Sequence, residues 1–161
     1  MKTFDFTPDN LGGLLQLFAI PPTSFLRIRH DYDDETDHLE LTRLEDVIAL
    51  PVHNNDSYSF NEDKSTSDAG DGWEILIEGV APHLDKRSAQ LMERLERGVW
   101  YVLAVDSNGI PHFCGQTDAW MTFDGRKQTG KSPTALNATV FSFRCLQDEP
   151  SLMVESDCAA L

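Results

Sequence analysis

The stretch that decides the fold reads Val99-Trp100-Tyr101-Val102-Leu103-Ala104-Val105 and continues directly into Asp106-Ser107-Asn108-Gly109. The first seven residues are apolar throughout, which is typical of a β-strand covered on both faces. Asn108-Gly109 supplies the two positive φ angles that a tight hairpin turn requires, so we expect Ile110–Gly115 to pair back antiparallel. The centre of the chain is therefore predicted to be a buried antiparallel hairpin.

Short alternations of apolar and polar residues continue this β pattern on both sides. The expected strands are Leu15–Ile20, Ser24–Arg29, His38–Arg43, Val47–Val52, Ser57–Asn61, Trp73–Glu78, Ala119–Phe123 and Thr139–Leu146. The polar stretch Glu62–Gly72 is interpreted as either a mobile loop or the tip of a long hairpin.

One helix is expected, at about residues 86–97. Asp85 is a favourable N-cap, and Gly98 stands where a left-handed residue would end the helix. Apolar side chains recur at three- and four-residue spacing between them: Ala89, Met92 and Leu95. The opposite face is charged, so this helix is predicted to pack one side against a sheet.

Together these patterns predict an α+β fold that is mostly β. We expect an antiparallel sheet, a sandwich or an open barrel with one packed helix. Residues 1–147 would form a single β-rich domain, and residues 148–161, with Pro150 and several acidic side chains, a loose C-terminal tail.

The chain of 161 residues is strongly acidic, with 27 Asp and Glu against 13 Lys and Arg and a formal charge of -14. A nucleic-acid-binding face needs a surplus of cations, so no nucleic-acid partner is expected. The same charge disfavours attachment to anionic membranes. The longest apolar stretch, Leu11–Ile20, is too short to cross a bilayer and lacks the basic start of a secretion signal. Cys114, Cys145 and Cys158 are therefore expected to be reduced thiols.

The run Gly125-Arg126-Lys127-Gln128-Thr129-Gly130-Lys131-Ser132 matches the pattern of a phosphate-binding loop. In such a site backbone N–H groups cradle phosphates, Lys131 reaches the terminal phosphates, and Ser132 binds Mg²⁺. The chemistry also requires a helix after the loop, and here about one turn of chain precedes the next strand pattern. We interpret the run as a hairpin loop. A nucleotide-binding enzyme using Gly125, Gly130, Lys131 and Ser132, with Asp106 on Mg²⁺, is kept as an alternative.

A second alternative is a Ca²⁺-responsive binding module built on Asp31, Asp33, Glu35 and Asp37. This segment lacks the mid-loop glycine and the distal Glu of the helix-loop-helix calcium site, so a solvated loop joining two strands is the preferred interpretation.

No other residue pattern predicts catalysis or a resident metal. His112, Cys114 and Cys145 could approach one another if their strands are neighbours, but zinc sites usually show closely spaced Cys and His pairs. No serine elbow or nucleophile–base pair is recognisable. We therefore expect no catalytic residues, no cofactor and no enzyme activity.

A set of short motifs covers most of residues 10–147. They are Asn10-Leu11-Gly12-Gly13, Ala19-Ile20-Pro21-Pro22, Gly98-Val99-Trp100-Tyr101-Val102-Leu103, Asp106-x-Asn108-Gly109, Cys114-Gly115, Met121-x-Phe123, Thr129-Gly130-Lys131, Leu136-Asn137 and Phe141-x-Phe143. In this order they resemble a group of phage and prophage proteins of Bacteroidetes, which are regarded as virion or tail-like structural components.

The resemblance implies a structural or assembly protein, such as a tail-associated subunit that acts through protein–protein contacts. Its partners would be copies of itself, as a homo-oligomer, or other phage structural proteins. It would be made in the bacterial cytoplasm and assembled into a virion or phage-like particle. The resemblance also implies that Thr129-Gly130-Lys131 is a loop feature of the group.

Overall fold

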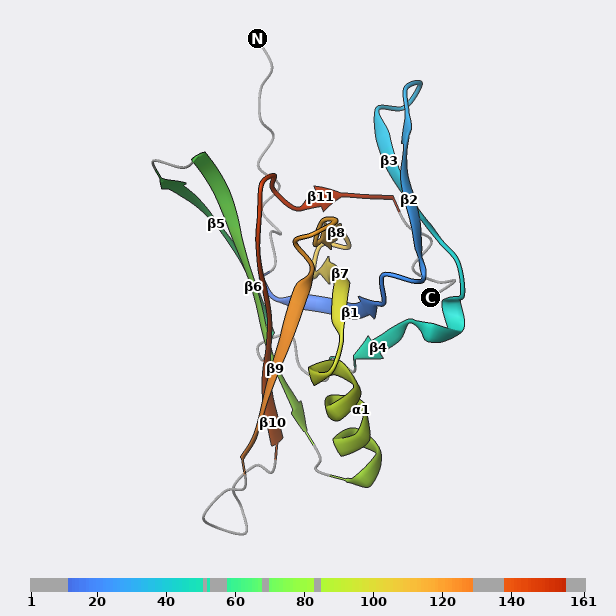
Figure 1. Cartoon of the computed structure of the whole chain (residues 1–161). Helices are drawn as coiled ribbons and strands as arrows, with labels where there is room; N and C mark the ends of the chain where they lie inside the picture. Colours follow the sequence, from blue (N-terminus) through green and yellow to red (C-terminus); the bar gives the residue numbers. More distant parts are fainter. Residues whose placement is uncertain are drawn as a thin grey trace.

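The computed structural model describes residues 12–50, 52, 58–67, 70–82, 85–128 and 138–155. Over these residues the protein is mostly β, with one α-helix and a large antiparallel sheet that does not close into a barrel (Figure 1). The predicted fold class, an antiparallel β fold with one packed helix, is confirmed.

Seven strands form the main path of the sheet. In spatial order they are β11 (Leu152–Met153), β8 (Pro111–Cys114), β7 (Val99–Asp106), β9 (Met121–Gln128), β10 (Ala138–Gln147), β6 (Gly70–Pro82) and β5 (Ser59–Ser67). Two further strands extend the sheet beside β7: β1 (Leu14–Ile20) pairs with β7, and β4 (Ile48–Leu50) pairs with β1. A separate hairpin is formed by β2 (Phe25–Asp31) and β3 (Thr36–Leu41).

Strand β7 belongs to both halves of the sheet. Its first two residues, Val99 and Trp100, pair with β9, whereas residues from Tyr101 onward pair with β1 and those from Val102 onward with β8. Because successive side chains of a strand point to opposite faces, β7 contributes to two cores. Trp100, Val102 and Ala104 enter the larger core, and Tyr101, Leu103 and Val105 enter the second.

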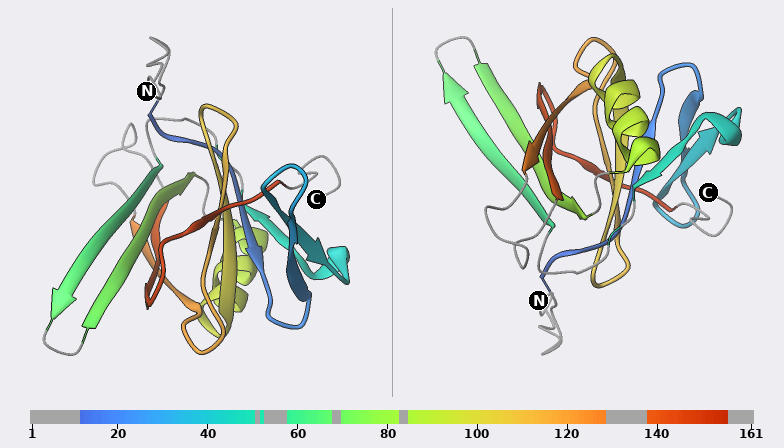
Figure 2. Two further views of the ribbon diagram at one scale, coloured as in Figure 1. Left: turned by 90° about the horizontal axis from the view of Figure 1, so that it is seen from above. Right: turned by 90° about the horizontal axis from the view of Figure 1, so that it is seen from below.

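The larger core lies between the β1-β7-β8 half of the sheet, the β9-β10-β6 half and the helix. Its largest fully buried side chains include Leu14, Leu17, Ile75, Ile77, Leu95, Met121, Phe141 and Phe143. The second core lies on the other face of β1, β7 and β8, where the β2–β3 hairpin covers Phe18, Ile20, Tyr101, Leu103 and Phe113. Figure 2 shows the β2–β3 and β5–β6 hairpins on opposite sides of β1 and β7.

Helix α1 (Lys86–Glu96) confirms the predicted helix and its N-cap. Ser88 N–H donates to Asp85 Oδ1 at 2.6 Å, and Asp85 N–H donates to Ser88 Oγ at 3.0 Å, which completes a capping box. At the other end, the Trp100 indole N–H donates to the carbonyl of Leu95 at 2.9 Å. The same carbonyl accepts the Gly98 N–H at 3.3 Å, and the indole bond ties the end of α1 to β7.

The expectation that Gly98 is left-handed was wrong, because Gly98 is not among the residues with positive φ. A Cβ at this position would lie 2.7 Å from Cζ2 of Trp100. Glycine is required here for the close approach of the indole and not for backbone handedness.

The turn after β7 also differs from the prediction. Only Gly109, with φ of 82°, adopts positive φ, and Asn108 does not. The Gly109 N–H donates to the carbonyl of Asp106 at 2.9 Å, and Asp106 N–H donates to the carbonyl of Ile110 at 3.0 Å. This is the pattern of a type I turn followed by a left-handed glycine, one residue longer than the expected turn. The antiparallel pairing of β7 with β8 is confirmed.

The polar stretch 62–72 and part of the C-terminal segment belong to the sheet. The polar stretch 62–72 is the end of the β5–β6 hairpin, so the hairpin interpretation is confirmed for its described residues. The prediction of a loose tail was wrong up to residue 155, because β11 pairs with β8 and Val154 packs into the second core at 4% exposure. Residues 156–161 lie outside the described residues.

Gly79 of β6 tests the packing of the larger core. A Cβ there would lie 2.6 Å from both Phe141 Cζ and Tyr58 Cε1, whereas a Cβ at Gly12 would meet nothing within 4 Å. Because overpacking forces side chains off their rotamers, Gly79→Ala is expected to lower the free energy of unfolding by about 1–3 kcal/mol. Gly12→Ala, the matched control, is expected to change it by less than about 0.5 kcal/mol. Urea unfolding measures both, and equal stability of the two variants would contradict this packing.

Candidate functional site

The described part of the phosphate-loop motif is a β-strand. Gly125 pairs with Phe141 inside the β9–β10 ladder, and the last pair of that ladder joins Gln128 to Ala138. A phosphate loop instead begins at its first glycine, after the strand has ended, and leads into a helix. Gly130, Lys131 and Ser132 lie outside the described residues, so their placement stays a prediction.

Asp106, the alternative's Mg²⁺ ligand, closes the turn after β7. Its Oδ1 accepts the N–H groups of Asn108 at 2.8 Å and Ile110 at 2.9 Å, and its Oδ2 lies 3.4 Å from His112 Nε2. Partial burial raises the pKa of Asp106, but these hydrogen bonds outweigh it and hold the pKa below its usual value. The carboxylate therefore has a structural role in the hairpin turn.

The four acidic residues proposed for Ca²⁺ lie around the β2–β3 turn. Asp31 Oδ1 accepts the N–H of Asp33 at 3.0 Å, and this bond is the main cause that lowers the pKa of Asp31. Asp37 Oδ1 lies 2.8 Å from His30 Nδ1, and Glu35 occupies the turn with φ of 52°. Among the described residues, no group of three or more His, Cys, Asp or Glu side chains is arranged to hold a metal ion.

The strands do bring the cysteines together, as the sequence allowed. Besides burial, Glu62 of β5 raises the pKa of both Cys114 of β8 and Cys145 of β10, and the nearby Cys145 also raises the pKa of Cys114. Burial raises the pKa of Cys145 to about 11 and that of Cys114 well above its usual value. His112 stacks on Phe60 with ring centroids 5.0 Å apart. Both thiols are therefore protonated at neutral pH and behave as core side chains.

A cavity of about 480 Å³ opens beside the second core. Its apolar wall includes the rings of Phe25, Tyr101 and Phe113, whose centroids lie 4.6 to 5.6 Å apart. Its rim carries Asp148 and Glu149. An aromatic wall with carboxylates at the rim suits an apolar or positively charged side chain of a partner.

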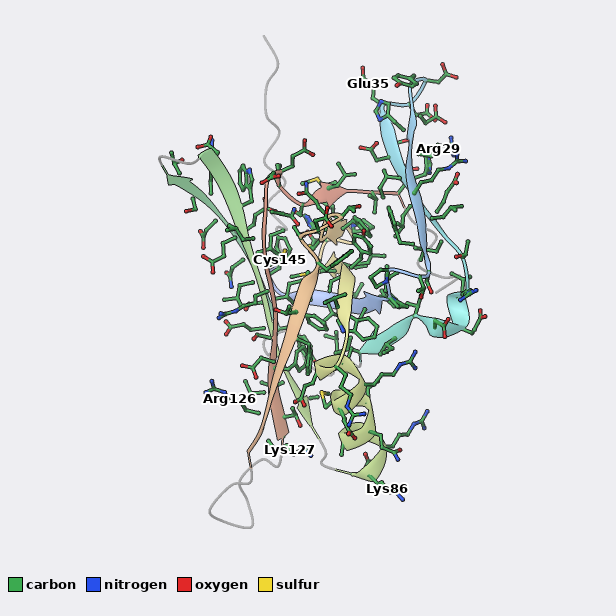
Figure 3. All side chains as sticks on the ribbon, viewed as in Figure 1. Arg29, Glu35, Lys86, Arg126, Lys127 and Cys145 are labelled. Atoms are coloured by element: carbon green, nitrogen blue, oxygen red, sulfur yellow. The ribbon has the colours of Figure 1, made fainter. Side chains whose placement is uncertain are left out.

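A smaller hollow of about 290 Å³ lies between α1 and β9. Its apolar part is formed by Ala89 and Met92, and Lys86 and Lys127 stand at its rim. Gln90, Glu93 and Glu96 complete the lining. We call this the α1–β9 hollow. Figure 3 shows Lys86, Arg126 and Lys127 at this end of the molecule.

Sequence reasoning missed one exposed aromatic side chain. Tyr32, in the turn between β2 and β3, is 85% exposed, the highest value among the large hydrophobic residues that the structure describes. Its ring meets His30 edge-on at 4.7 Å. The acidic residues around it drew attention to metal binding, although an exposed aromatic among charges is also typical of a protein–protein contact.

Comparison with family models, with curated proteins and with solved structures finds no match. Within the described residues, no helix is long and apolar enough to cross a membrane.

The nucleotide alternative is tested by titrating ATP and GTP with Mg²⁺ in a calorimeter. Because Gly125–Gln128 form a strand, no binding is expected, and Lys131→Ala is expected to behave like the wild type. Arg144→Ala, an exposed position on β10, is the control for loss of one positive charge. Micromolar binding that Lys131→Ala abolishes and Arg144→Ala preserves would overturn the hairpin interpretation.

Proposed function

We propose that this chain is a structural subunit that assembles through protein–protein contacts, as a tail-associated component of a phage or phage-like particle. The sequence resemblance to virion proteins of Bacteroidetes phages and prophages motivates the phage context. The end of the β5–β6 hairpin supports the assembly role, since it extends the sheet beyond both hydrophobic cores.

The end of the β5–β6 hairpin carries this proposal. Residues 63–66 are exposed, and on the facing strand Gly70, Asp71 and Glu74 are exposed as well. An ion pair between Lys64 Nζ and Asp71 Oδ2, at 2.7 Å, joins the two strands. A two-stranded hairpin without a hydrophobic face is marginally stable in water, and an exposed ion pair adds only about 0–1 kcal/mol. A partner that covers this hairpin would stabilise it and would bury a large area of both proteins in the contact.

The outer edge of β5 adds a second feature of the same kind. β5 ends the sheet, so one side of this strand has no neighbour among the described strands. Free backbone N–H and C=O groups along an edge pair readily with another strand. The edge is polar and charged, with Asn61, Asp63 and Lys64, which limits uncontrolled aggregation and favours a specific, charged partner.

Sedimentation velocity from micromolar to millimolar protein tests the assembly role. The wild type is expected to form larger species as concentration rises. A variant in which residues 64–73 are replaced by Asn-Gly keeps the Asp63↔Glu74 register and is expected to fold, because the removed segment lies outside both cores. It is expected to associate at least about tenfold more weakly.

A wild type that stays monomeric over the whole range would contradict the proposed function. Unchanged association of the shortened variant would remove the hairpin end as its basis. The phage context is tested separately by the gene neighbourhood, where genes for other virion proteins are expected on either side.

A further inference from the structure

We propose that the subunits join head to tail, with the β2–β3 turn of one copy docked in the α1–β9 hollow of the next. This inference rests on the proposed assembly function and names the partner as a second copy of the same chain. It starts from the two ends of the molecule, which carry opposite charge.

The acidic end is the β2–β3 turn. Tyr32, Asp33, Asp34 and Glu35 are all exposed there. Within the described residues, no ion pair involves the last three. The turn is held in shape by the hydrogen bond from Asp33 N–H to Asp31 Oδ1, and a shaped turn loses less conformational entropy on binding. It therefore offers one aromatic side chain surrounded by negative charge.

The basic end is the rim of the α1–β9 hollow. Lys86 and Lys127 line this hollow, whereas Arg126 points away from α1 (Figure 3). Both lysines are exposed, and over the described part of the chain neither forms an ion pair. Lys86 and Arg87 also occupy the first turn of α1, where cations are unfavourable, next to the carboxylate of the N-cap Asp85. A negatively charged partner would relieve this repulsion.

The hollow suits a single aromatic ring. Its volume of about 290 Å³ lies near the lower end of the roughly 300–1,000 Å³ of small-ligand sites. Ala89 provides an apolar contact for the ring of Tyr32, above Met92, which is buried in the larger core. Lys86 and Lys127 provide cations for its π face and for the neighbouring carboxylates. Of the two acids in the lining, Glu93 is bonded to Arg97, and Glu96 can accept a hydrogen bond from the phenol.

The larger cavity beside the second core does not suit this turn. Among the described residues, its lining contains Asp148 and Glu149 and no Lys or Arg, so it would repel Asp33 and Asp34. In the α1–β9 hollow, Lys86 and Lys127 offset the two glutamates. The charges therefore favour the α1–β9 hollow as the docking site.

The positions of the two surfaces decide the kind of assembly. Figure 3 shows Glu35 at one end of the molecule and Lys86, Arg126 and Lys127 at the opposite end. A contact between different surfaces leaves one free turn and one free hollow at the ends of every complex. Such a contact adds further copies until a ring closes, or continues as an open chain.

Mixing two variants tests the inference by sedimentation velocity. Lys86→Glu/Lys127→Glu disables the hollow and keeps the turn, whereas Tyr32→Ala/Asp34→Lys disables the turn and keeps the hollow. Each variant alone is expected to associate at least about tenfold more weakly than the wild type. An equimolar mixture is expected to form dimers and nothing larger, because one intact turn meets one intact hollow.

The matched control is Arg43→Glu/Arg144→Glu, which makes the same charge change at exposed positions away from both surfaces. It is expected to assemble like the wild type, and melting curves confirm that all variants fold. Raising NaCl from about 0.05 M to about 0.5 M is expected to weaken the wild-type contact, because salt screens exposed charges.

Three results separate the possible failures. If the wild type assembles and both variants assemble equally well, the head-to-tail contact is wrong and the assembly function stands. If each variant is monomeric and the mixture forms no dimer, the two surfaces do not bind each other, and the inference is also overturned. If the wild type is monomeric throughout, the proposed function itself fails.

Discussion

The structure depends on the alternation of side chains along β7. Odd and even residues of this strand enter different cores, and its two ends pair with different halves of the sheet. The strand is therefore buried on both faces and cannot shift register by one residue without exchanging the contents of the two cores. Trp100 adds a further constraint, because its indole bonds to the carbonyl of Leu95 and fixes α1 against the strand.

The remaining elements are arranged by this strand. The larger core places α1 beside β9, which creates the α1–β9 hollow and brings Lys86 and Lys127 to its rim. The second core holds the base of the β2–β3 hairpin through Phe25 and Ile28, while its turn stays in water. The two charged surfaces are thus attached to opposite faces of the same buried strand, and the cores determine where each of them lies.

Much of this fold could be predicted from the sequence because local patterns decide it. The apolar run of β7 predicts a buried strand, Asp85 predicts the start of α1, and the alternation in β10 predicts a strand with one buried face. Three predictions failed where side-chain packing or hydrogen bonding, and not the residue pattern alone, decides. Gly98 is small because Trp100 covers it, the 106–110 turn is one residue longer than the Asn-Gly rule implies, and residues 152–154 join β8. The exposure of Tyr32 and the juxtaposition of α1 with β9 also depend on tertiary packing, so no local pattern revealed the α1–β9 hollow.

The central claim is that β7 fixes both cores and leaves the hairpin ends for contacts with neighbouring subunits. Hydrogen exchange measured by mass spectrometry at low and high protein concentration tests this directly. The account predicts that β7 amides exchange slowest at every concentration, because they open only with global unfolding. The β2–β3 turn, the end of the β5–β6 hairpin and the first turn of α1 exchange fast when dilute and gain protection when concentrated. Fast exchange in β7, or hairpin ends whose exchange is independent of concentration while larger species form, would contradict it.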